Sequence, residues 1–282
     1  MNAPFDPTAA GLGTAAESAL TVITVTRGRP ETLRGAIATV AAQDYPFPVE
    51  HLIVVDDDEE AYRPVWSSVG GTPDRTLRWH FAERRPGERS GSPVLGRLRN
   101  MAARLAETEL VAYLDDDNLL EPHHYSSLLR CMRRTGCTAV HSQRRLMHPD
   151  GSLFLTRLSP WKRDIVSAVR RYAELRRHDV YVPWSNVIRD QVHARDVPDR
   201  IQMVDTSEWL FTRAQLLAAP FGEQFTEADR LSMTGEDNKL LAALVDQGVA
   251  VAGTHMPTLI YLLGGFSNGY DQPVKGETWE AA

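Results

Sequence analysis

The sequence contains few cysteines and no long apolar run. Cys131 and Cys137 are the two cysteines among 282 residues. A disulfide framework or a zinc site needs more ligands than this pair offers, so we expect two reduced thiols. No stretch approaches the ~18 apolar residues of a membrane-spanning helix. Residues 1–19 lack the basic start of a signal peptide. They are predicted to form a flexible tail, and the protein is predicted to be cytoplasmic.

Positive charge is also scarce for a nucleic-acid-binding protein. The formal net charge is −6, and lysine occurs three times against 28 arginines. Proteins that bind nucleic acid normally present a basic face, so this function class is disfavoured. The hydrophobic fraction of 43% is ordinary and supports a full core. The composition therefore predicts a globular protein. It does not identify a ligand, for which only local motifs give evidence.

Strands and helices alternate through the first 120 residues. Apolar runs of strand length lie at 20–26, 51–55, 76–81 and 110–114, and helical spacing covers 30–43 and 94–106. This order predicts an α/β fold with a mainly parallel central sheet and flanking helices. A single domain is expected over 20–270, and 271–282 is expected to be a second tail.

The second half is less regular. We expect a strand at 138–143, a strand at 249–252 and helices at 124–134, 161–177, 207–218 and 236–247. The helix at 161–177 is basic. Such a helix can meet an acidic carrier protein or a membrane surface, although a solvated face is the commoner explanation.

Three consecutive aspartates, Asp115, Asp116 and Asp117, directly follow the apolar run 110–114. The carboxyl end of a buried strand faces the crevice where open α/β sheets bind ligands. Asp115 and Asp117 are two residues apart, so they can project to the same side. Two carboxylates suit Mg²⁺ or Mn²⁺, and such an ion is usually completed by ligand phosphates. The motif indicates an enzyme that handles a nucleoside diphosphate. A helix-capping loop is the structural alternative.

Several motifs in order resemble family 2 glycosyltransferases. They are Val22 to Pro30, Gln43-Asp44-Tyr45-Pro46, the strand ending at Asp56-Asp57, Gly96-Arg97-Leu98-Arg99-Asn100, the three aspartates, and Gly235-Glu236-Asp237. The resemblance covers roughly residues 20 to 265. It implies a GT-A fold, a nucleotide-activated sugar and a divalent metal, with residues 20–120 binding the donor and 121–270 the acceptor.

The resemblance also implies roles for the residues at the strand ends. Asp117 would bind the metal directly, and Asp115 would contact the ribose or reach the metal through water. Asp57 would accept the uracil N3–H, with Thr26 and Arg27 beside it. Two further residues are placed with the nucleotide: these are Asp116 and Arg99. The alternatives are a solvated acidic turn for Asp57 and a solvated helix face for Arg99.

The sequence departs from the family pattern just after the first strand. Many relatives carry an aromatic residue and then asparagine there, and this chain has Arg27 and Gly28. The aromatic residue would stack on the base. The guanidinium plane of an arginine can also stack on a nucleobase, so Arg27 is compatible with a nucleotide site. Which nucleobase the site prefers is left open.

The later acidic motif implies the catalytic base. Asp237 would deprotonate the acceptor, and Glu236 would bind the acceptor or support Asp237; plain helix capping is the alternative. Trp184, Trp209 and Tyr181 could form an acceptor platform, although core packing is commoner for aromatic residues.

Three acceptor-side or metal-side candidates remain. Asp205 and Glu208 are possible acceptor contacts, and His255 is a possible third metal ligand, although a single histidine is more often structural. The segment 264–268 could close over the site or be a surface turn.

Together these features predict a metal-dependent, inverting glycosyltransferase with a nucleoside diphosphate sugar, most simply a UDP-sugar, as donor. The acceptor would be a hydroxyl or amine on a small molecule, a carrier-bound intermediate or a lipid-linked molecule. A non-catalytic nucleotide-sugar-binding protein and a nucleotidyltransferase are the alternatives. A nucleotidyltransferase would normally carry a longer glycine-rich loop with lysine after its first strand, and this chain does not.

Overall fold

The structure is a computed structural model of the chain. It describes residues 18–268 apart from 58, 86, 89, 163, 195–196, 198–200, 233 and 266–267. Both predicted tails thus lie outside the described residues, except for Ser18 and Ala19.

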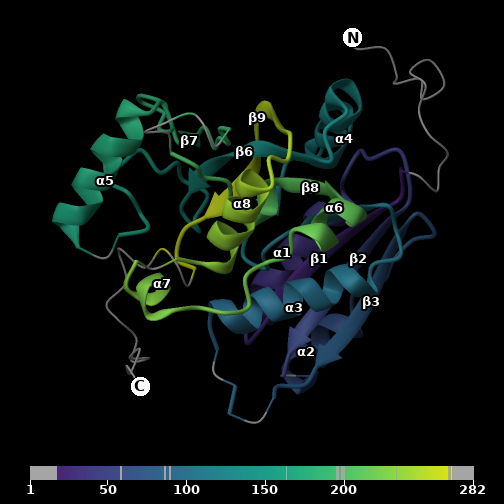
Figure 1. Cartoon of the computed structure of the whole chain (residues 1–282). Helices are drawn as coiled ribbons and strands as arrows, with labels where there is room; N and C mark the ends of the chain where they lie inside the picture. Colours follow the sequence, from purple (N-terminus) through teal and green to yellow (C-terminus); the bar gives the residue numbers. More distant parts are fainter. Residues whose placement is uncertain are drawn as a thin grey trace.

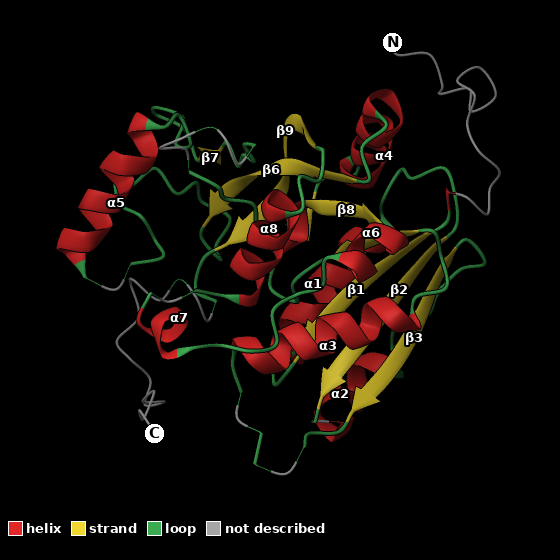
Figure 2. Cartoon of the chain, viewed as in Figure 1, coloured by secondary structure: helices red, strands yellow, loops and turns green. Residues whose placement is uncertain are grey.

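One nine-stranded sheet forms the centre of the described chain (Figures 1 and 2). Its strands are β1 (Leu20–Thr26), β2 (Val49–Asp56), β3 (Arg75–Ala82), β4 (Leu110–Tyr113), β5 (Leu119–Leu120), β6 (Ala139–Met147), β7 (Val187–Ile188), β8 (Trp209–Thr212) and β9 (Val251–Leu262). The order is β3-β2-β1-β4-β8-β6-β9-β5, and β7 pairs with β6. Strands β3, β2, β1 and β4 are parallel to one another, β8 runs antiparallel, and β6 and β9 are again a parallel pair. The prediction of a mainly parallel α/β sheet is confirmed.

Helices cover both faces of this sheet (Figure 1). They are α1 (Pro30–Ala41), α2 (Glu59–Trp66), α3 (Ser92–Leu105), α4 (His124–Thr135), α5 (Ile165–Arg177), α6 (Arg213–Ala218), α7 (Glu227–Leu231) and α8 (Glu236–Asp246). Helices α3, α6 and α8 pack on one face of the central strands, and α1 and α4 pack on the other. Neighbouring residues of β1 and β4 point to opposite faces, and both faces are covered by helices, so most of their side chains are apolar. The buried hydroxyls of Thr24 and Thr26 donate hydrogen bonds to the Leu114 carbonyl and to Asp116.

The predicted helix at 207–218 is wrong in its first half. Residues Thr206–Glu208 form one 3-10 turn, Trp209–Thr212 form β8, and only Arg213–Ala218 are helical. Strand β8 lies between β4 and β6 and is hydrogen-bonded to both. Helical spacing cannot reveal that residues 209–212 form a strand of the sheet, because that pairing depends on distant strands.

Two other elements also differ from prediction. The predicted strand at 249–252 continues to Leu262 as β9, with a register shift opposite residues 141–144 of β6. Helix α2, which follows β2, was not predicted. Strand β9 ends beside the residues that follow the three aspartates, since the Leu262 amide donates to Asn118 Oδ1 at 3.2 Å.

Helix α5 packs on a separate hydrophobic cluster at the end of β6 and β9. Its residues are Leu146, Phe154, Leu175, Val180, Tyr181, Ile188, Tyr261 and Leu263. The basic segment predicted at 161–177 becomes helical only at Ile165, because Asp164 caps it by accepting a hydrogen bond from the Ser167 amide.

None of the helices in the described part of the chain is both long enough and apolar enough to cross a membrane.

Candidate active site

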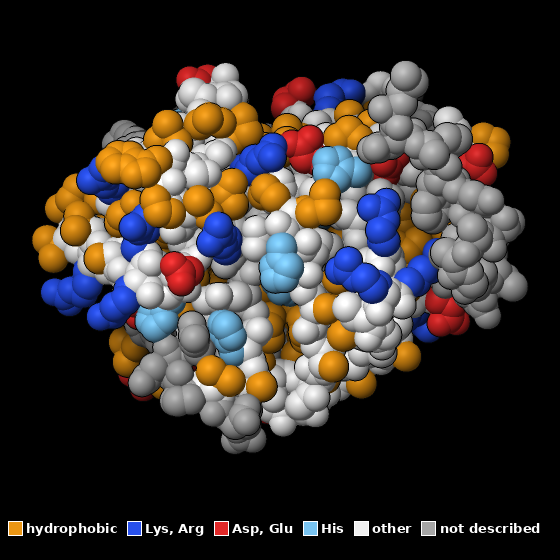
Figure 3. Space-filling view, turned by 90° about the horizontal axis from the view of Figure 1, so that it is seen from above, with side chains coloured by type: hydrophobic (Ala, Val, Ile, Leu, Met, Phe, Trp, Pro, Cys, Tyr) orange, Lys and Arg blue, Asp and Glu red, His pale blue; other side chains and the backbone are white. Residues whose placement is uncertain are grey.

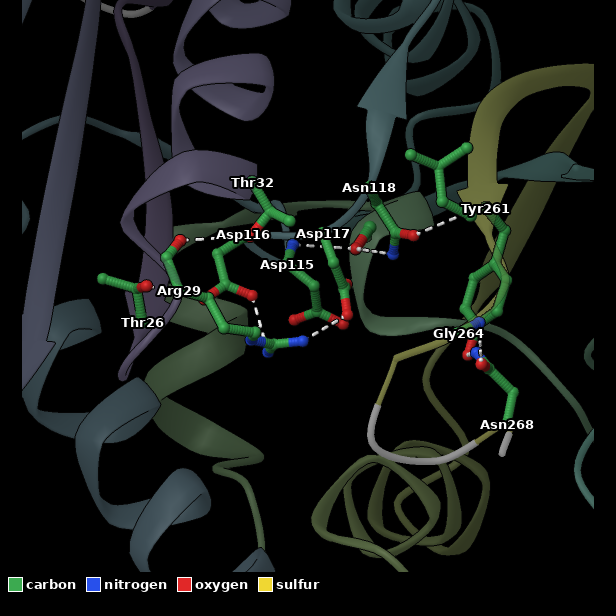
Figure 4. Close-up of polar contacts among 12 residues, drawn as sticks. Thr26, Arg29, Thr32, Asp115, Asp116, Asp117, Asn118, Tyr261, Gly264 and Asn268 are labelled. Atoms are coloured by element: carbon green, nitrogen blue, oxygen red, sulfur yellow. Dashed lines mark hydrogen bonds and ion pairs between the residues drawn. The ribbon is translucent and has the colours of Figure 1, made fainter. Parts of the chain in front are cut away.

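The three aspartates follow β4 after Leu114, and two of them turn their carboxylates toward one arginine (Figure 4). Arg29, from the turn between β1 and α1, reaches Asp116 through Nη2 at 2.6 Å and Asp117 through Nη1 at 2.5 Å. Asp116 is fully buried and accepts a 2.6 Å hydrogen bond from Thr26 Oγ1. Burial raises the pKa of Asp116 to about 7, although the positive charge of Arg29 acts in the opposite direction.

Asp115 turns instead toward helix α3. Its Oδ1 accepts a 2.6 Å charged hydrogen bond from Arg99 Nη2, and its backbone N–H donates to Ser207 Oγ at 3.0 Å. The other guanidinium nitrogen of Arg99 donates to Glu236, the first residue of α8. Arg99 is only 3% exposed. A single buried arginine thus joins the aspartate motif to the later acidic motif, whose Glu236 lies 137 residues beyond Arg99 in the chain.

Asp237 follows Glu236 in the first turn of α8. Its Oδ1 accepts a 2.8 Å hydrogen bond from the Asn238 amide. Burial, and then the negative charge of Glu236, raise the pKa of Asp237 to about 7. Arg99 opposes this shift. A carboxylate with a pKa near neutrality has a basicity suited to accepting a proton at physiological pH.

The junction between α3 and α8 is held at close range. A Cβ placed on Gly96 of α3 would lie 2.2 Å from the carbonyl oxygen of Gly222 and 3.3 Å from Glu236 Cβ. Asn100, one turn further on, donates to the Phe221 carbonyl at 3.0 Å. Glycine at position 96 lets α3 approach closely enough for Arg99 to reach Glu236.

A second buried arginine lies in β6. Arg144 of β6 contacts Asp205 at 2.6 Å and Asp190 at 2.9 Å. Glu208 is also fully buried and accepts a 2.8 Å hydrogen bond from the Asp205 amide. Burial raises the pKa of all three carboxyls, to about 7 for Asp190. Ser207 links the two arginine centres: its hydroxyl oxygen accepts from the Asp115 amide and its own amide donates to Asp205 Oδ1, both at 3.0 Å.

The end of β2 provides a further acidic pair. Asp56 is buried and forms a two-point ion pair with Arg84, at 3.0 and 2.7 Å. Asp57 is exposed, with φ at +56°, and its amide donates to the Ala82 carbonyl. Arg27 is exposed and donates to Ser90, a residue of the loop before α3. Asp57 and Arg27 are thus exposed polar side chains at the carboxyl ends of β2 and β1. The nucleobase of the donor was expected at this place.

The segment after β9 lies over Asp117. A Cβ placed on Gly265 would lie 2.5 Å from Asp117 Oδ2. The Gly264 amide donates to Asn268 Oδ1 at 2.6 Å, and Asn268 Nδ2 donates to the Tyr261 hydroxyl at 3.1 Å (Figure 4). The middle of the predicted closing segment, 266–267, falls outside the described residues.

Three predicted site residues lie in other surroundings. Trp209 is 2% exposed and stacks on Phe211 in the core, so it is no acceptor platform. Trp184 is 84% exposed and stacks with Arg157 beside α5. His255 is exposed in the irregular part of β9. These positions follow from strand pairing and loop course, which the local sequence does not encode.

Two of the acceptor-side candidates are also placed by the fold. Tyr181 is buried in the cluster beneath α5. Asp205 is held by its ion pair with Arg144 and stays an acceptor-side candidate.

Sequence reasoning missed two arginines and one aspartate at the site: Arg29, Arg144 and Asp190. Arg29 had a local signal, because it directly precedes Pro30 at the start of a helix that follows a buried strand. Arg144 and Asp190 had none, since nothing near them in the sequence distinguishes them from the many surface arginines and aspartates. Their importance follows from full burial and mutual pairing, at 2.9 Å.

Comparisons with known proteins identify the family and the fold. The sequence profile described as glycosyl transferase family 2 matches residues 21–181. No curated protein matches the chain significantly.

Two solved structures illustrate the likeness in fold. Residues 1–349 of S. aureus TarS, in complex with UDP-GlcNAc, align with a TM-score of 0.53 over 90% of this chain and 61% of that one, at 13% identity. A mannosyltransferase from Pyrobaculum calidifontis, in complex with GDP-Man and Mn²⁺, aligns with a TM-score of 0.51 over 89% and 58%, at 16% identity. The chain therefore spans about 60% of the length of these structures. The predicted GT-A fold is confirmed.

Proposed function

Because the chain belongs to glycosyl transferase family 2, we propose that it transfers a sugar from a nucleoside diphosphate sugar to a hydroxyl or amine acceptor, with inversion at the anomeric carbon. UDP is the expected nucleotide. Solved structures of the same fold contain UDP-GlcNAc or GDP-Man. The exposed Asp57 and Arg27 support a base site at the ends of β1 and β2.

The observation that carries the proposal is the arginine bridge between the two acidic motifs. Arg99 contacts Asp115 with one nitrogen and Glu236 with another. Asp237 is the next residue along α8. The bridge places a carboxyl suited to proton transfer beside the carboxylates that would face a diphosphate. A protein that only bound a nucleotide sugar would not need a base with a raised pKa at this point.

Asp115 and Asp117 suit a divalent cation by the chemistry of their oxygens. Each leaves one carboxylate oxygen without a hydrogen bond from any residue that the structure describes. The described chain holds no group of three or more His, Cys, Asp or Glu side chains able to bind an ion. One or two carboxylates completed by phosphate oxygens is the usual arrangement for Mg²⁺. We assign Asp117 and Asp115 as the protein ligands and leave His255 out. The bound ion would stabilise the departing diphosphate as a Lewis acid.

In the proposed reaction, Asp237 accepts the proton of the acceptor hydroxyl or amine. The acceptor atom forms a bond to the anomeric carbon as the bond to the diphosphate oxygen breaks, and the diphosphate leaves with that electron pair. Glu236 and Arg99 fix the position of Asp237 and are positioning residues. Asp205 is assigned to the acceptor side, where Arg144 fixes its carboxylate at 2.6 Å.

Calorimetric titration with UDP-, GDP- and dTDP-sugars, with and without Mn²⁺, tests the donor assignment. We expect one nucleotide class to bind only with the metal, and Asp117→Ala to remove that metal-dependent binding. Asp150→Asn changes an aspartate in an exposed turn and is the control. If no nucleotide sugar binds, the transferase proposal is wrong.

Arg29 makes a separate prediction about the metal. It pairs with Asp116 and Asp117, so a divalent ion must compete with a guanidinium for the same carboxylates. We expect Arg29→Ala to bind Mn²⁺ about tenfold more tightly without nucleotide, which corresponds to about 1.4 kcal/mol. Electron paramagnetic resonance of free Mn²⁺ measures this directly. Arg34→Ala, which removes an arginine that bonds Ser68, should leave the affinity unchanged. Weaker Mn²⁺ binding by Arg29→Ala would show that Arg29 organises the ligands instead of competing for them.

A further inference from the structure

An exposed apolar surface lies on and around α5. The described residues expose eleven large apolar side chains, and six belong to residues 153–184: Leu153, Leu155, Ile165, Val166, Val169 and Trp184. Each is at least 48% exposed. We call these six side chains the α5 surface. In Figure 3, apolar and basic side chains gather together on the left of the view, on the side where Figure 1 places α5.

The α5 surface is strongly basic in a protein of net negative charge. Residues 153–189 contain eight Lys and Arg against three Asp and Glu, whereas the whole chain has a net charge of −6. Arg157, Arg170 and Arg177 are exposed. On α5, Val166, Arg170 and Arg177 share the face opposite the buried Ala168, so apolar and cationic groups alternate along one side of the helix.

Trp184 is held outward by its neighbours. The guanidinium of Arg157 stacks over the indole ring at 4.2 Å. Arg157, Trp184, Tyr172 and Arg176 line a hollow of about 190 Å³. Trp184 itself has φ at +58°, an uncommon conformation for a bulky residue. Trp184 is 84% exposed and has arginines beside it. Exposed tryptophan together with basic residues is typical of protein surfaces that bind at the headgroup level of a bilayer.

The α5 surface is joined to the candidate active site by packed side chains. Arg144, which binds Asp205 and Asp190, stacks against the rings of Trp161 and Tyr261, at 4.9 and 5.2 Å. Trp161 and Tyr261 also pack with the cluster beneath α5. Arg144, which fixes the proposed acceptor residue Asp205, thus packs against the same hydrophobic cluster that carries α5.

We propose that the α5 surface docks on an anionic lipid membrane. Its apolar side chains project from a convex helix and the loops beside it, and a bilayer accepts such a shape without a complementary groove. The surrounding arginines match the negative headgroups in charge. An acidic carrier protein would be attracted by the arginines but would leave the isolated apolar side chains without a matching pocket. If the proposed transfer reaction is right, this docking favours a lipid-linked acceptor over a small dissolved one.

Vesicle sedimentation tests the docking without any nucleotide sugar, so its outcome does not depend on the proposed reaction. We expect the protein to bind phosphatidylcholine vesicles containing about one-third phosphatidylglycerol, and to be released as salt rises from about 0.1 to about 0.5 M. Trp184→Ala should weaken this binding about tenfold. The double variant Arg170→Glu, Arg177→Glu should weaken it further, because it reverses two charges.

Trp66→Ala is the matched control, because Trp66 is also exposed but belongs to α2. It should bind vesicles like the unaltered protein, and thermal unfolding should show that every variant is folded. Equal loss in Trp66→Ala and Trp184→Ala would overturn the proposal. Two other results would also overturn it: binding to polyglutamate without binding to vesicles, which indicates an acidic protein partner, or a dimer that Trp184→Ala dissociates in analytical ultracentrifugation.

Discussion

Asp237→Asn is expected to reduce sugar transfer by about 10²- to 10⁴-fold while the donor still binds. The amide has nearly the same shape as the carboxyl and can still accept the Asn238 amide hydrogen bond at 2.8 Å. It cannot take a proton from the acceptor. The measurement is the rate of sugar release from the donor, with water or an added alcohol as acceptor, alongside calorimetric donor affinity. A variant that transfers sugar at the full rate would remove Asp237 from the mechanism.

The same residue predicts the pH dependence of the reaction. The base must be deprotonated, and burial and Glu236 raise the pKa of Asp237 to about 7. The rate should therefore rise with pH, tenfold per unit well below pH 7, and level off above it. An Asp237→Asn variant should lose this dependence in its residual rate. A rate that is flat between about pH 5 and pH 8 would mean that another group accepts the proton.

The raised pKa of Asp237 also makes the free energy of unfolding depend on pH, between the ordinary pKa of an aspartate and about pH 7. An aspartate with a raised pKa binds its proton in the folded state between its ordinary pKa and about 7, where the unfolded chain has already lost it. Stability from this group is thus present at acid pH and falls as pH rises toward 7. Asp190 acts in the same direction, since burial raises its pKa to about 7.

Arg99→Met should have the largest effect on stability. Removing one partner from a buried ion pair typically costs about 3–5 kcal/mol, because the remaining charges are left without compensation. Here Asp115, Glu236 and Asp237 would lose their common cation. Urea unfolding measures the change, and sugar transfer should be lost with it.

Arg63→Met provides a control for this variant. Arg63 of α2 pairs with Glu59 at 3.8 Å, and their side chains are 69% and 51% exposed. An exposed ion pair contributes about 0–1 kcal/mol, so this variant should unfold close to the unaltered protein. If the two variants lose equal stability, Arg99 is not the centre that joins α3 to α8. Arg99→Lys should recover only part of the loss, because an ammonium group cannot reach two carboxylates in the geometry of a guanidinium.

The local sequence was sufficient to predict strands β1 to β4 and helices α1 and α3 of the first half of the fold, but not α2. Runs rich in β-branched and apolar residues predicted β1, β2 and β4, and Pro30 marked the start of α1. These signals are local, because a strand covered on both faces is mainly apolar and a helix start needs suitable backbone geometry. The acids at the strand ends were found for the same reason. Their position at the crevice follows from parallel strands ending at one edge.

The tertiary structure alone decided how charges pair across the site. Arg99 lies 16 residues from Asp115 and 137 from Glu236, and Arg29 lies 88 residues from Asp117. No local pattern identifies such partners, because each contact depends on how distant strands and helices pack.

Strand β8 and the two tryptophans illustrate the same division. Trp209 begins a strand because β4 and β6 offer hydrogen-bonding edges on both sides, and this pairing overrides the helical spacing of its neighbours. Trp184 is exposed because its loop turns outward beside Arg157. The sequence by itself determined the apolar runs, the helix starts and the acids that follow the strands. Packing decided which aromatic side chain is core, which is surface, and which arginine neutralises which carboxylate, since these depend on contacts between distant segments.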